Sequence, residues 1–370
     1  MQTANLNKEK LTGSRIGVVF GTFAPLHLGH QKIIYKALME NDSVVLIVSG
    51  YLDDRGDQIG LPLDKRFRYL RETFNDELNL RIDILDETDL PRLPKGWEQW
   101  TKRLTTVIED NLKGEQPHHY KVYVGEKEYV SELQKRLPEN FEIELQNREE
   151  LPITATDIRE APLQHWNSIS RVFRRHFTKK ILIAGSASTG KSTLVKRLAR
   201  TFNAPFSEEF ARTYEEQNNV NDDELRASDY AEFILGQWSA NYQEVINPSN
   251  NGLTFFDTDV MVTKAYAQLY LSETDNAELH SLFDMMIKRE KFDLIFIIPP
   301  ITTYVDDGFR NMDWANSTDA YHHALMEIIS AYGFSDKVVI LDDKGKDEYD
   351  GFYQRYLHAC KAVSTLLEEQ

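Results

Sequence analysis

The sequence predicts an α/β fold with two domains, each built on a parallel sheet. Short apolar runs alternate along the chain with stretches of helical periodicity, which is the pattern of parallel strands joined by helices. The pattern begins at Ile16–Phe20 and restarts at Lys180–Ala184. The length of 370 residues agrees with two domains, because one domain usually contains about 100–200 residues.

The composition is typical of a globular chain that binds small ligands. Hydrophobic residues make up 41% of the chain and charged residues 28%, which is enough apolar material for a core in each domain. The formal net charge of −16 repels nucleic acid and anionic membranes, although a local basic site can still hold phosphates. We therefore expect no DNA partner and no membrane partner.

Two further observations favour a cytoplasmic location. The single cysteine, Cys360, excludes an internal disulfide and a multi-cysteine zinc site, and it fits a reducing compartment. The segment Met1–Lys10 is polar and lacks the apolar core of a secretory signal. The longest apolar stretches, around Val44–Val48 and Leu294–Ile298, are too short to span a membrane.

The first domain begins with the strand Ile16–Phe20, which ends in the turn Gly21–Pro25 before a helix that starts near His30. Further strands are expected at Val44–Ser49 and Lys121–Val124, and helices around Arg66–Thr73 and Trp100–Ile108. This order predicts a parallel sheet that is covered on both faces.

The second domain begins with the strand Lys180–Ala184 and a helix over Ser192–Thr201. We place the boundary near residue 170, which gives domains over residues 14–170 and 171–370. The connecting segment, Ala161–Thr178, contains a basic cluster that is either a phosphate-binding patch or a solvated helix end. The cluster consists of Arg171, Arg174, Arg175 and His176.

A first candidate site lies where the first strand passes into its helix. His27 and His30 are three residues apart there, with Gly29 between them. Backbone N–H groups and the positive end of the helix face any anion at this position. The imidazoles can donate hydrogen bonds to a phosphate, and the glycine permits close approach. The structural alternative is that the histidines only cap the helix; a zinc site is disfavoured because no cysteine is near.

The segment Gly21–His30 resembles the G-x-F-x-P-x-H-x-G-H signature of the nucleotidylyltransferase superfamily, and Ile153–Arg159 resembles its second signature, I-S-x-T-x-I-R, with Thr154 in place of the serine. The resemblance implies a Rossmann-like domain in which an acceptor attacks the α-phosphate of ATP and pyrophosphate is released. It implies catalytic roles for His27, His30 and Arg159, and ATP contacts from Gly21, Thr22, Phe23, Gly29 and Thr156.

The acceptor of the nucleotidyl group is indicated by two further segments. Trp97 could stack on a cationic pyridinium ring, although its spacing from Trp100 suits a core helix equally well. The charged loop Asp53–Asp57 is either a solvated loop or part of the acceptor site. The pyridine-nucleotide branch of the superfamily has a stacking tryptophan and a similar loop, which implies that Trp97 and Asp54 bind NMN.

The second candidate site is the segment Gly185–Ser192, which matches the P-loop pattern G-x-x-x-x-G-K-[ST] between a strand and a helix. In such loops the lysine, here Lys191, reaches the β- and γ-phosphates, and the hydroxyl of Ser192 binds Mg²⁺. The ATP contacts expected from the motif are Gly185, Ser188, Thr189, Gly190, Lys191, Ser192 and Thr193.

Three later segments could complete a kinase site. Asp257 and Asp259 follow an apolar strand. They could bind a metal ion, with Asp257 as the ligand, or deprotonate a hydroxyl. The alternative is that they only cap a turn. Glu209 and Arg212 are expected to bind substrate. Arg310, in the loop after Leu294–Ile298, could close over ATP as a catalytic residue. No guanine-selecting N-K-x-D segment is apparent, which disfavours a GTPase.

Over nearly its whole length the chain is similar to the NadR family of bifunctional NMN adenylyltransferases and ribosylnicotinamide kinases. The motifs follow in the family's order: both transferase signatures, the P-loop, then Glu209–Arg212, Asp257–Asp259 and Asp307–Arg310. The resemblance implies that nicotinamide riboside and ATP give NMN, and that NMN and ATP give NAD and pyrophosphate, each with Mg²⁺.

Some NadR proteins also carry an N-terminal helix-turn-helix that represses transcription. About 15 residues precede the first strand, fewer than the roughly 20 that such a motif requires, so we expect that role to be absent. Two alternatives stay open: a different nucleotidylyltransferase fused to a different small-molecule kinase, and a nucleotide sensor without turnover. The oligomeric state is also open, and a homo-oligomer is possible.

Overall fold

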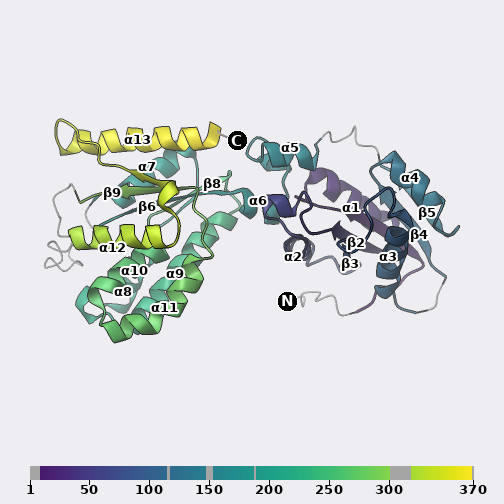
Figure 1. The fold of residues 1–370 in the computed structure, drawn as a ribbon, viewed down its shortest axis with the longest axis horizontal. Coiled ribbons are helices and arrows are strands. Elements are labelled where there is room, and N and C mark those ends of the chain that lie inside the picture. Colours follow the sequence, from purple (N-terminus) through teal and green to yellow (C-terminus); the bar gives the residue numbers. More distant parts are fainter. Residues whose placement is uncertain (1–8, 115–116, 147–152, 187–188, 301–317, 369–370) are drawn as a thin grey trace. The chain divides into compact units, whose positions relative to one another are not determined.

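The computed structural model describes residues 9–114, 117–146, 153–186, 189–300 and 318–368. The chain divides into two compact units, Met1–Arg174 and Arg175–Gln370 (Figure 1). The division falls within a short helix, α6 (Arg171–Phe177), slightly later than the boundary expected from the sequence. Over the described ranges, no helix is long and apolar enough to cross a membrane.

The first unit is built on a parallel five-stranded sheet with the order β3-β2-β1-β4-β5. Its strands are β1 (Arg15–Gly21), β2 (Ser43–Gly50), β3 (Leu80–Asp86), β4 (His119–Val124) and β5 (Phe141–Leu145). The central strand β1 pairs Val18 with Val45 on one side and with Val122 on the other. These three valines are fully buried, which explains the apolar runs of the sequence.

The helices of the first unit cover both faces of its sheet. They are α1 (Leu28–Glu40), α2 (Leu63–Thr73), α3 (Trp97–Asp110), α4 (Lys127–Gln134) and α5 (Ala155–Glu160), followed by α6. The sequence predicted that this helix starts at Trp100, but α3 begins three residues earlier, at Trp97. It buries Leu104 and Ile108 against β1, β2 and β4. The helix α1 begins at Leu28, so both histidines of the first motif lie at its N-terminus.

The second unit has its own parallel five-stranded sheet with the order β10-β9-β6-β8-β7. Its strands are β6 (Lys179–Gly185), β7 (Phe206–Ser207), β8 (Leu253–Phe256), β9 (Leu294–Ile298) and β10 (Val338–Ile340). Its helices are α7 (Lys191–Phe202), α8 (Phe210–Asn218), α9 (Ala227–Ile246), α10 (Val260–Tyr270), α11 (Glu273–Ile287), α12 (Thr318–Ala331) and α13 (Glu348–Glu368). The predicted α/β class with two parallel sheets is confirmed.

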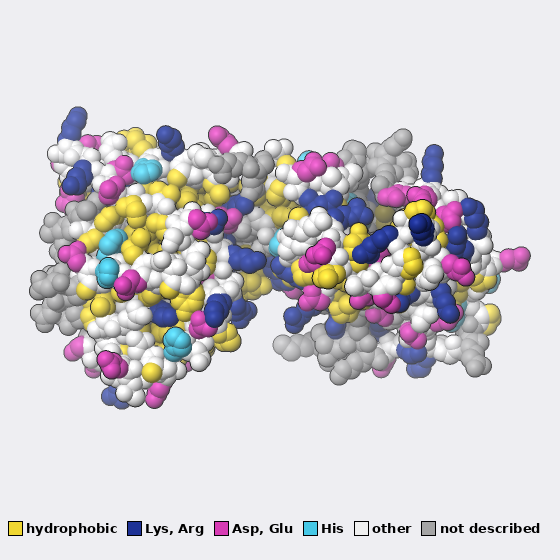
Figure 2. Space-filling view, in the orientation of Figure 1, with side chains coloured by type: hydrophobic (Ala, Val, Ile, Leu, Met, Phe, Trp, Pro, Cys, Tyr) yellow, Lys and Arg dark blue, Asp and Glu magenta, His cyan; other side chains and the backbone are white. Residues whose placement is uncertain are grey.

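Two apolar cores fill the second unit, one on each face of its sheet. One core packs α9, α10, α11 and α12 against the sheet. The other packs α7 and α13 against the opposite face, with Leu198 and Val363 fully buried. The visible face of the chain carries acidic and basic side chains interspersed with one another (Figure 2). Part of the basic linker cluster is used in packing, because Arg175 donates to the hydroxyl of Tyr242 over 3.0 Å.

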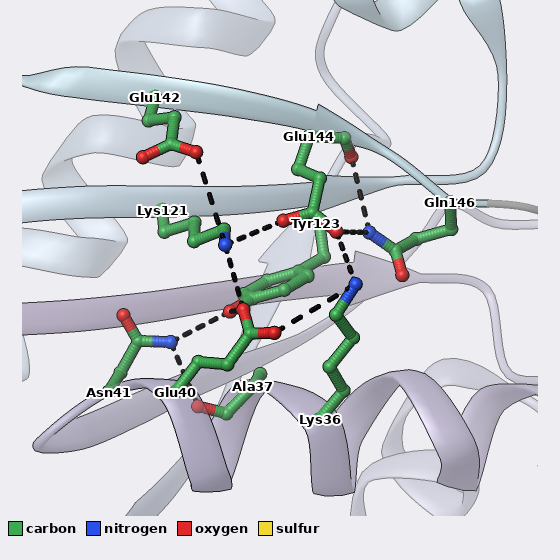
Figure 3. Close-up of polar contacts among 9 residues, drawn as sticks. All are labelled: Lys36, Ala37, Glu40, Asn41, Lys121, Tyr123, Glu142, Glu144 and Gln146. Carbon is green, nitrogen blue, oxygen red and sulfur yellow. Dashed lines mark hydrogen bonds and ion pairs between the residues drawn. The ribbon is translucent and has the colours of Figure 1, made fainter.

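A network of charged side chains ties α1 to β4 and β5 (Figure 3). The Nζ atom of Lys121 lies 2.7 Å from Glu40 and 2.6 Å from Glu144, and Lys36 also pairs with Glu144. Tyr123 donates to Glu40 over 2.8 Å. Burial alone would raise the pKa of Glu144, but the hydrogen bonds from the two lysines outweigh it and lower the pKa to about 2. The network therefore holds the helix that carries both histidines.

Replacing Glu144 with glutamine should destabilise the first unit by about 1 kcal/mol at neutral pH, because it removes a partly exposed carboxylate that accepts from two lysines. The pKa of this carboxylate is lowered in the folded state from 4.5 to about 2. Its stabilisation is therefore present above about pH 4.5 and is lost as the pH falls towards 2. Calorimetry should show that the difference in the free energy of unfolding between wild type and Glu144→Gln becomes smaller over that range.

The control is Glu142→Gln, because Glu142 is 70% exposed and lies 3.9 Å from Lys121. It should unfold like wild type at every pH. If the difference in the free energy of unfolding between wild type and Glu144→Gln stayed constant down to pH 2, the role assigned to the carboxylate would be contradicted.

Candidate active sites

His27 and His30 form one aromatic group at the start of α1. His27 is the N-cap residue, and its Nδ1 accepts a hydrogen bond from the Gly29 N–H over 3.1 Å. Because Nδ1 is an acceptor, the proton of the neutral ring is on Nε2, where it can be donated to a ligand. The two imidazole centroids are 3.7 Å apart, and Phe23 packs edge-on against His30. Capping and phosphate binding are therefore compatible roles for His27.

Gly29 lies close against the imidazole of His27 in this packing. A Cβ atom at this position would lie 3.0 Å from the imidazole of His27, closer than side chains normally approach. Three other residues expected to contact ATP, Gly21, Thr22 and Phe23, link the end of β1 to the segment before the histidines. The whole first motif therefore lies at the carboxyl end of the central strand, where parallel sheets bind their ligands.

The second transferase motif packs directly onto the first. Thr154 caps α5 in a capping box with Asp157. Arg159 donates to the carbonyl of Ala24 over 2.9 Å and to the Thr156 hydroxyl over 2.8 Å. Burial, and then the positive charge of Arg55, lower the pKa of Arg159. A bound polyphosphate would relieve this repulsion between the two guanidinium groups.

Asp54 forms a buried ion pair that the sequence did not reveal. Its Oδ2 lies 2.7 Å from Arg66, a residue of α2 that is fully buried. Arg66 also donates to the carbonyl of Thr22 over 2.7 Å, so it connects the loop after β2 to the first motif. Asp54 is itself only 3% exposed, and its direct contact with a substrate stays a prediction. The available signal for Arg66 was its place on the same helical face as Leu63 and Leu70, which are three and four residues away.

Trp97 lies in the core of the first unit. It is 3% exposed, and its ring packs edge-on against Tyr129 at 4.9 Å and Trp100 at 5.9 Å. Its indole N–H has no hydrogen-bond partner among the residues that the structure describes. Of the two interpretations that the sequence left open, the burial favours the core residue, and stacking on a pyridinium ring stays a prediction.

The P-loop joins β6 to α7 as the motif requires. Gly190 has a φ of +85°, and a Cβ there would lie 2.3 Å from the ring of Phe352 in α13. Lys191 donates to the carbonyl of Ser186 over 3.0 Å, and Thr189 donates to the same carbonyl over 2.8 Å. Lys191, Ser192 and Thr193 form the first turn of α7, whose N–H groups can bind phosphate. Ser188 and Arg310 lie outside the described residues.

The two aspartates after β8 have different surroundings. Asp257 faces the P-loop: burial raises its pKa to about 6, although Lys191 and a hydrogen bond with Ser192 oppose the shift. Asp259 is fully buried and caps α10 by accepting from the Val262 N–H over 3.2 Å. Burial raises its pKa to about 7. In both carboxylates one oxygen lacks a partner within the described ranges.

Glu209 is the residue before α8, and Arg212 of the same helix pairs with Glu216 at 3.3 Å. Gln237 of α9 holds this segment on both sides of Glu209. It accepts from the Phe210 N–H over 2.7 Å and donates to the Glu208 carbonyl over 3.2 Å. The backbone around the predicted substrate residue Glu209 is therefore fixed by a buried amide.

Asn241, one turn after Gln237 on α9, extends this polar network to the aspartate segment. Its amide donates to the carbonyl of Thr258 over 3.0 Å, and its oxygen accepts from Ser207 and Gln237. The sequence analysis missed both side chains. Two amides four residues apart on the buried side of a helix are the signal that could have indicated them, because buried amides need partners.

Known proteins resemble this chain over its whole length. Residues 180–346 match a family model described as an AAA domain. The crystal structure of a NadR protein in complex with NR has a TM-score of 0.89 and 52% sequence identity, covering 97% of this chain and 98% of that one. A NadR structure in complex with NAD and AMP-PNP has a TM-score of 0.86 and 51% identity, with the same coverage.

A curated relative, the trifunctional NAD biosynthesis/regulator protein NadR of Salmonella typhimurium, is 28% identical over 363 residues. The alignment covers 96% of this chain and 84% of the relative.

If Trp97 stacks on the predicted acceptor, Trp97→Ala should raise the KM for NMN well above any change in the KM for ATP, since such stacking contributes about 1–3 kcal/mol. Steady-state kinetics of the adenylyl transfer with each substrate varied in turn would measure both constants. Leu104→Ala, which removes a fully buried side chain from the same helix, is the control for a core defect. Equal changes for both substrates in Trp97→Ala would identify Trp97 as a core residue.

Asp257→Asn should reduce phosphorylation strongly, because it removes the carboxylate that faces Lys191 and Ser192. Asp259→Asn tests the second aspartate, since asparagine caps a helix as well as aspartate does. We expect folded protein in both cases, checked by circular dichroism, and loss of kinase turnover. Kinase turnover that persists in both variants would reduce this segment to a structural turn.

Proposed function

The chain belongs to the NadR family, and we propose that it makes NAD in two ATP-dependent steps with residues of its own two domains. It is a NadR-type NAD biosynthesis enzyme with an NMN adenylyltransferase domain and a ribosylnicotinamide kinase domain. The observation that supports the residue roles is that the central strand of each sheet leads into a helix whose first turn carries one of the two motifs, α1 after β1 and α7 after β6.

In the adenylyl transfer, at the first site, a phosphate oxygen of NMN attacks the α-phosphate of ATP, and pyrophosphate leaves. The protein supplies hydrogen-bond donors and positive charge rather than a nucleophile. We assign donation to the phosphates to His27, through Nε2–H, and to His30. Arg159, which Ala24 and Thr156 hold in place, would bind the triphosphate.

In the riboside phosphorylation, which supplies NMN, a hydroxyl of nicotinamide riboside attacks the γ-phosphate of another ATP at the second site, and ADP leaves. Lys191 would neutralise the transferring group, and Glu209 with Arg212 would hold the riboside. Asp257 would deprotonate the hydroxyl or hold a metal ion. The sequence assigned closure over ATP to Arg310, and that role stays a prediction.

Mg²⁺ fits the donors of the second site. It prefers oxygen ligands, and the hydroxyl of Ser192 and the carboxylate of Asp257 lie together there. One buried oxygen of Asp257 has no partner in the part of the chain that the structure describes. When bound, the ion would neutralise phosphate charge.

We propose NMN, nicotinamide riboside, NAD and ATP as the ligands of this chain. Solved NadR proteins bind NR, NAD and AMP-PNP, which supports all but NMN directly. A cytoplasmic location agrees with the lone cysteine and with these substrates. A panel of other nucleosides and nucleotide acceptors would test the alternative that the same phosphate sites serve different acceptors.

The two activities should be separable by mutation, because each has its own ATP site. His30→Ala should slow adenylyl transfer by roughly 10²–10³-fold, the usual effect of losing one transition-state donor. Lys191→Ala should abolish riboside phosphorylation. Chromatography of reactions fed with riboside and Mg-ATP should show NAD from wild type, accumulated NMN from His30→Ala, and neither product from Lys191→Ala.

Each variant serves as the control for the other. Lys191→Ala should still convert supplied NMN to NAD, and His30→Ala should phosphorylate riboside at the wild-type rate. Loss of both half-reactions in either folded variant would contradict two independent sites and would require one shared nucleotide site.

A further inference from the structure

Glu87 lies at the same edge of the first sheet as the transferase motifs. It follows the last residue of β3, and its N–H donates to the carbonyl of Gly50 at the end of β2 over 2.8 Å. The strand register places Gly50 opposite Asp86, and Val48 opposite Gly21. The carboxylate therefore lies beyond the ends of β2 and β3, where ligands of parallel sheets bind.

The side chain of Glu87 is half-buried between two neutral hydrogen-bond donors, and the negative charge of Asp54 also acts on it. It accepts hydrogen bonds from the indole of Trp100 and the hydroxyl of Ser49, and its charge acts on Tyr129. Burial raises the pKa of Glu87. The guanidinium of Arg92 also acts on it, but this group lies over the ring of Tyr51, 3.3 Å from its centroid.

The neighbouring carboxylates are used differently. Asp54 pairs with the buried Arg66, and Asp89 pairs with Arg103. Glu87 instead receives its hydrogen bonds from neutral donors, so its negative charge is not neutralised by them. The two reactions proposed above leave this carboxylate without a role, although burying it costs free energy.

We propose that Glu87 is the residue that selects the amide acceptor NMN against its deamidated analogue, nicotinic acid mononucleotide, in the adenylyl transfer. This inference rests on the proposed function of the first site. The acceptor phosphate must reach His27, His30 and Arg159 beyond the end of β1. The predicted acceptor residues Asp54 and Trp97 follow β2 and begin α3, so we place its base along the same edge beyond β2 and β3.

The chemistry of discrimination is simple at that position. The amide of NMN donates an N–H to the carboxylate of Glu87. The carboxylate of the deamidated analogue would face the same group with a like charge, which is strongly unfavourable in a partly buried site. Charge repulsion thus excludes nicotinic acid mononucleotide, and the two acceptors can be distinguished without a difference in the shape of the site.

The test compares Glu87→Gln with wild type for both acceptors at saturating ATP. Glutamine keeps the shape and the acceptor oxygen, but it removes the charge and adds a donor for a carboxylate. The ratio of kcat/KM for NMN to kcat/KM for nicotinic acid mononucleotide should fall at least about tenfold, mainly through better use of the acid. The ratio does not depend on the folded fraction of a preparation, because both values come from the same protein.

The matched control is Glu98→Gln, which removes an exposed carboxylate from the first turn of α3. It should leave the ratio unchanged, and both variants should keep the wild-type KM for ATP and the riboside kinase rate. An unchanged ratio in Glu87→Gln, or an equal loss with both acceptors, overturns the inference while the proposed function stands. Failure of wild-type protein to make a dinucleotide from either acceptor overturns the proposed function itself.

Discussion

Both sites depend on the unpaired N–H groups at the start of a helix that follows the central strand of a parallel sheet. An N-terminal helical turn has N–H groups with no partner in its own helix, and its dipole favours negative charge. In each unit the turn from strand to helix must also leave room for an aromatic ring, and in the first unit the ring of His27 accepts from one of these groups, the Gly29 N–H. Gly29 beneath the ring of His27, and Gly190 beneath the ring of Phe352, satisfy this constraint by leaving room for an aromatic group.

The two units treat their most deeply buried carboxylates in different ways. The first unit pairs Asp54 with Arg66 and with the N–H groups of Gly56 and Asp57. The second unit leaves Asp257 and Asp259 with raised pKa values and without a bidentate partner. A carboxyl whose pKa is raised by folding costs stability once the pH rises above its unfolded value. The second unit therefore gives up stability at neutral pH for groups that its chemistry would use.

Local patterns in the sequence predicted the strands β1, β2, β4, β6, β8 and β9 and the place of both phosphate motifs, because each motif is contiguous and lies next to an apolar run. They did not indicate β3, β5, β7 or β10. They could not predict contacts between distant segments. The pair of Asp54 with Arg66, and the bonds of Gln237 and Asn241, arise only when separate helices and loops pack together. The sequence also did not decide whether Trp97 is a core residue or stacks on a ligand, since helical spacing does not tell which side of a helix faces a ligand. Asp257 and Asp259 differ for the same reason: only the fold turns one of them towards the P-loop.

The packing of Phe352 against Gly190 also has a consequence for folding during synthesis, because the chain is made from its N-terminus. The P-loop lies near the start of the second unit, whereas α13, which supports it and fills the core beside α7, comes last in that unit. The first unit is complete in the sequence before β6 begins, so it can fold while the ribosome is still making the rest. The P-loop of the second unit cannot complete its packing this early. Its support from Phe352 is present only after α13 has been made, and until then the face of the sheet that α13 covers stays exposed.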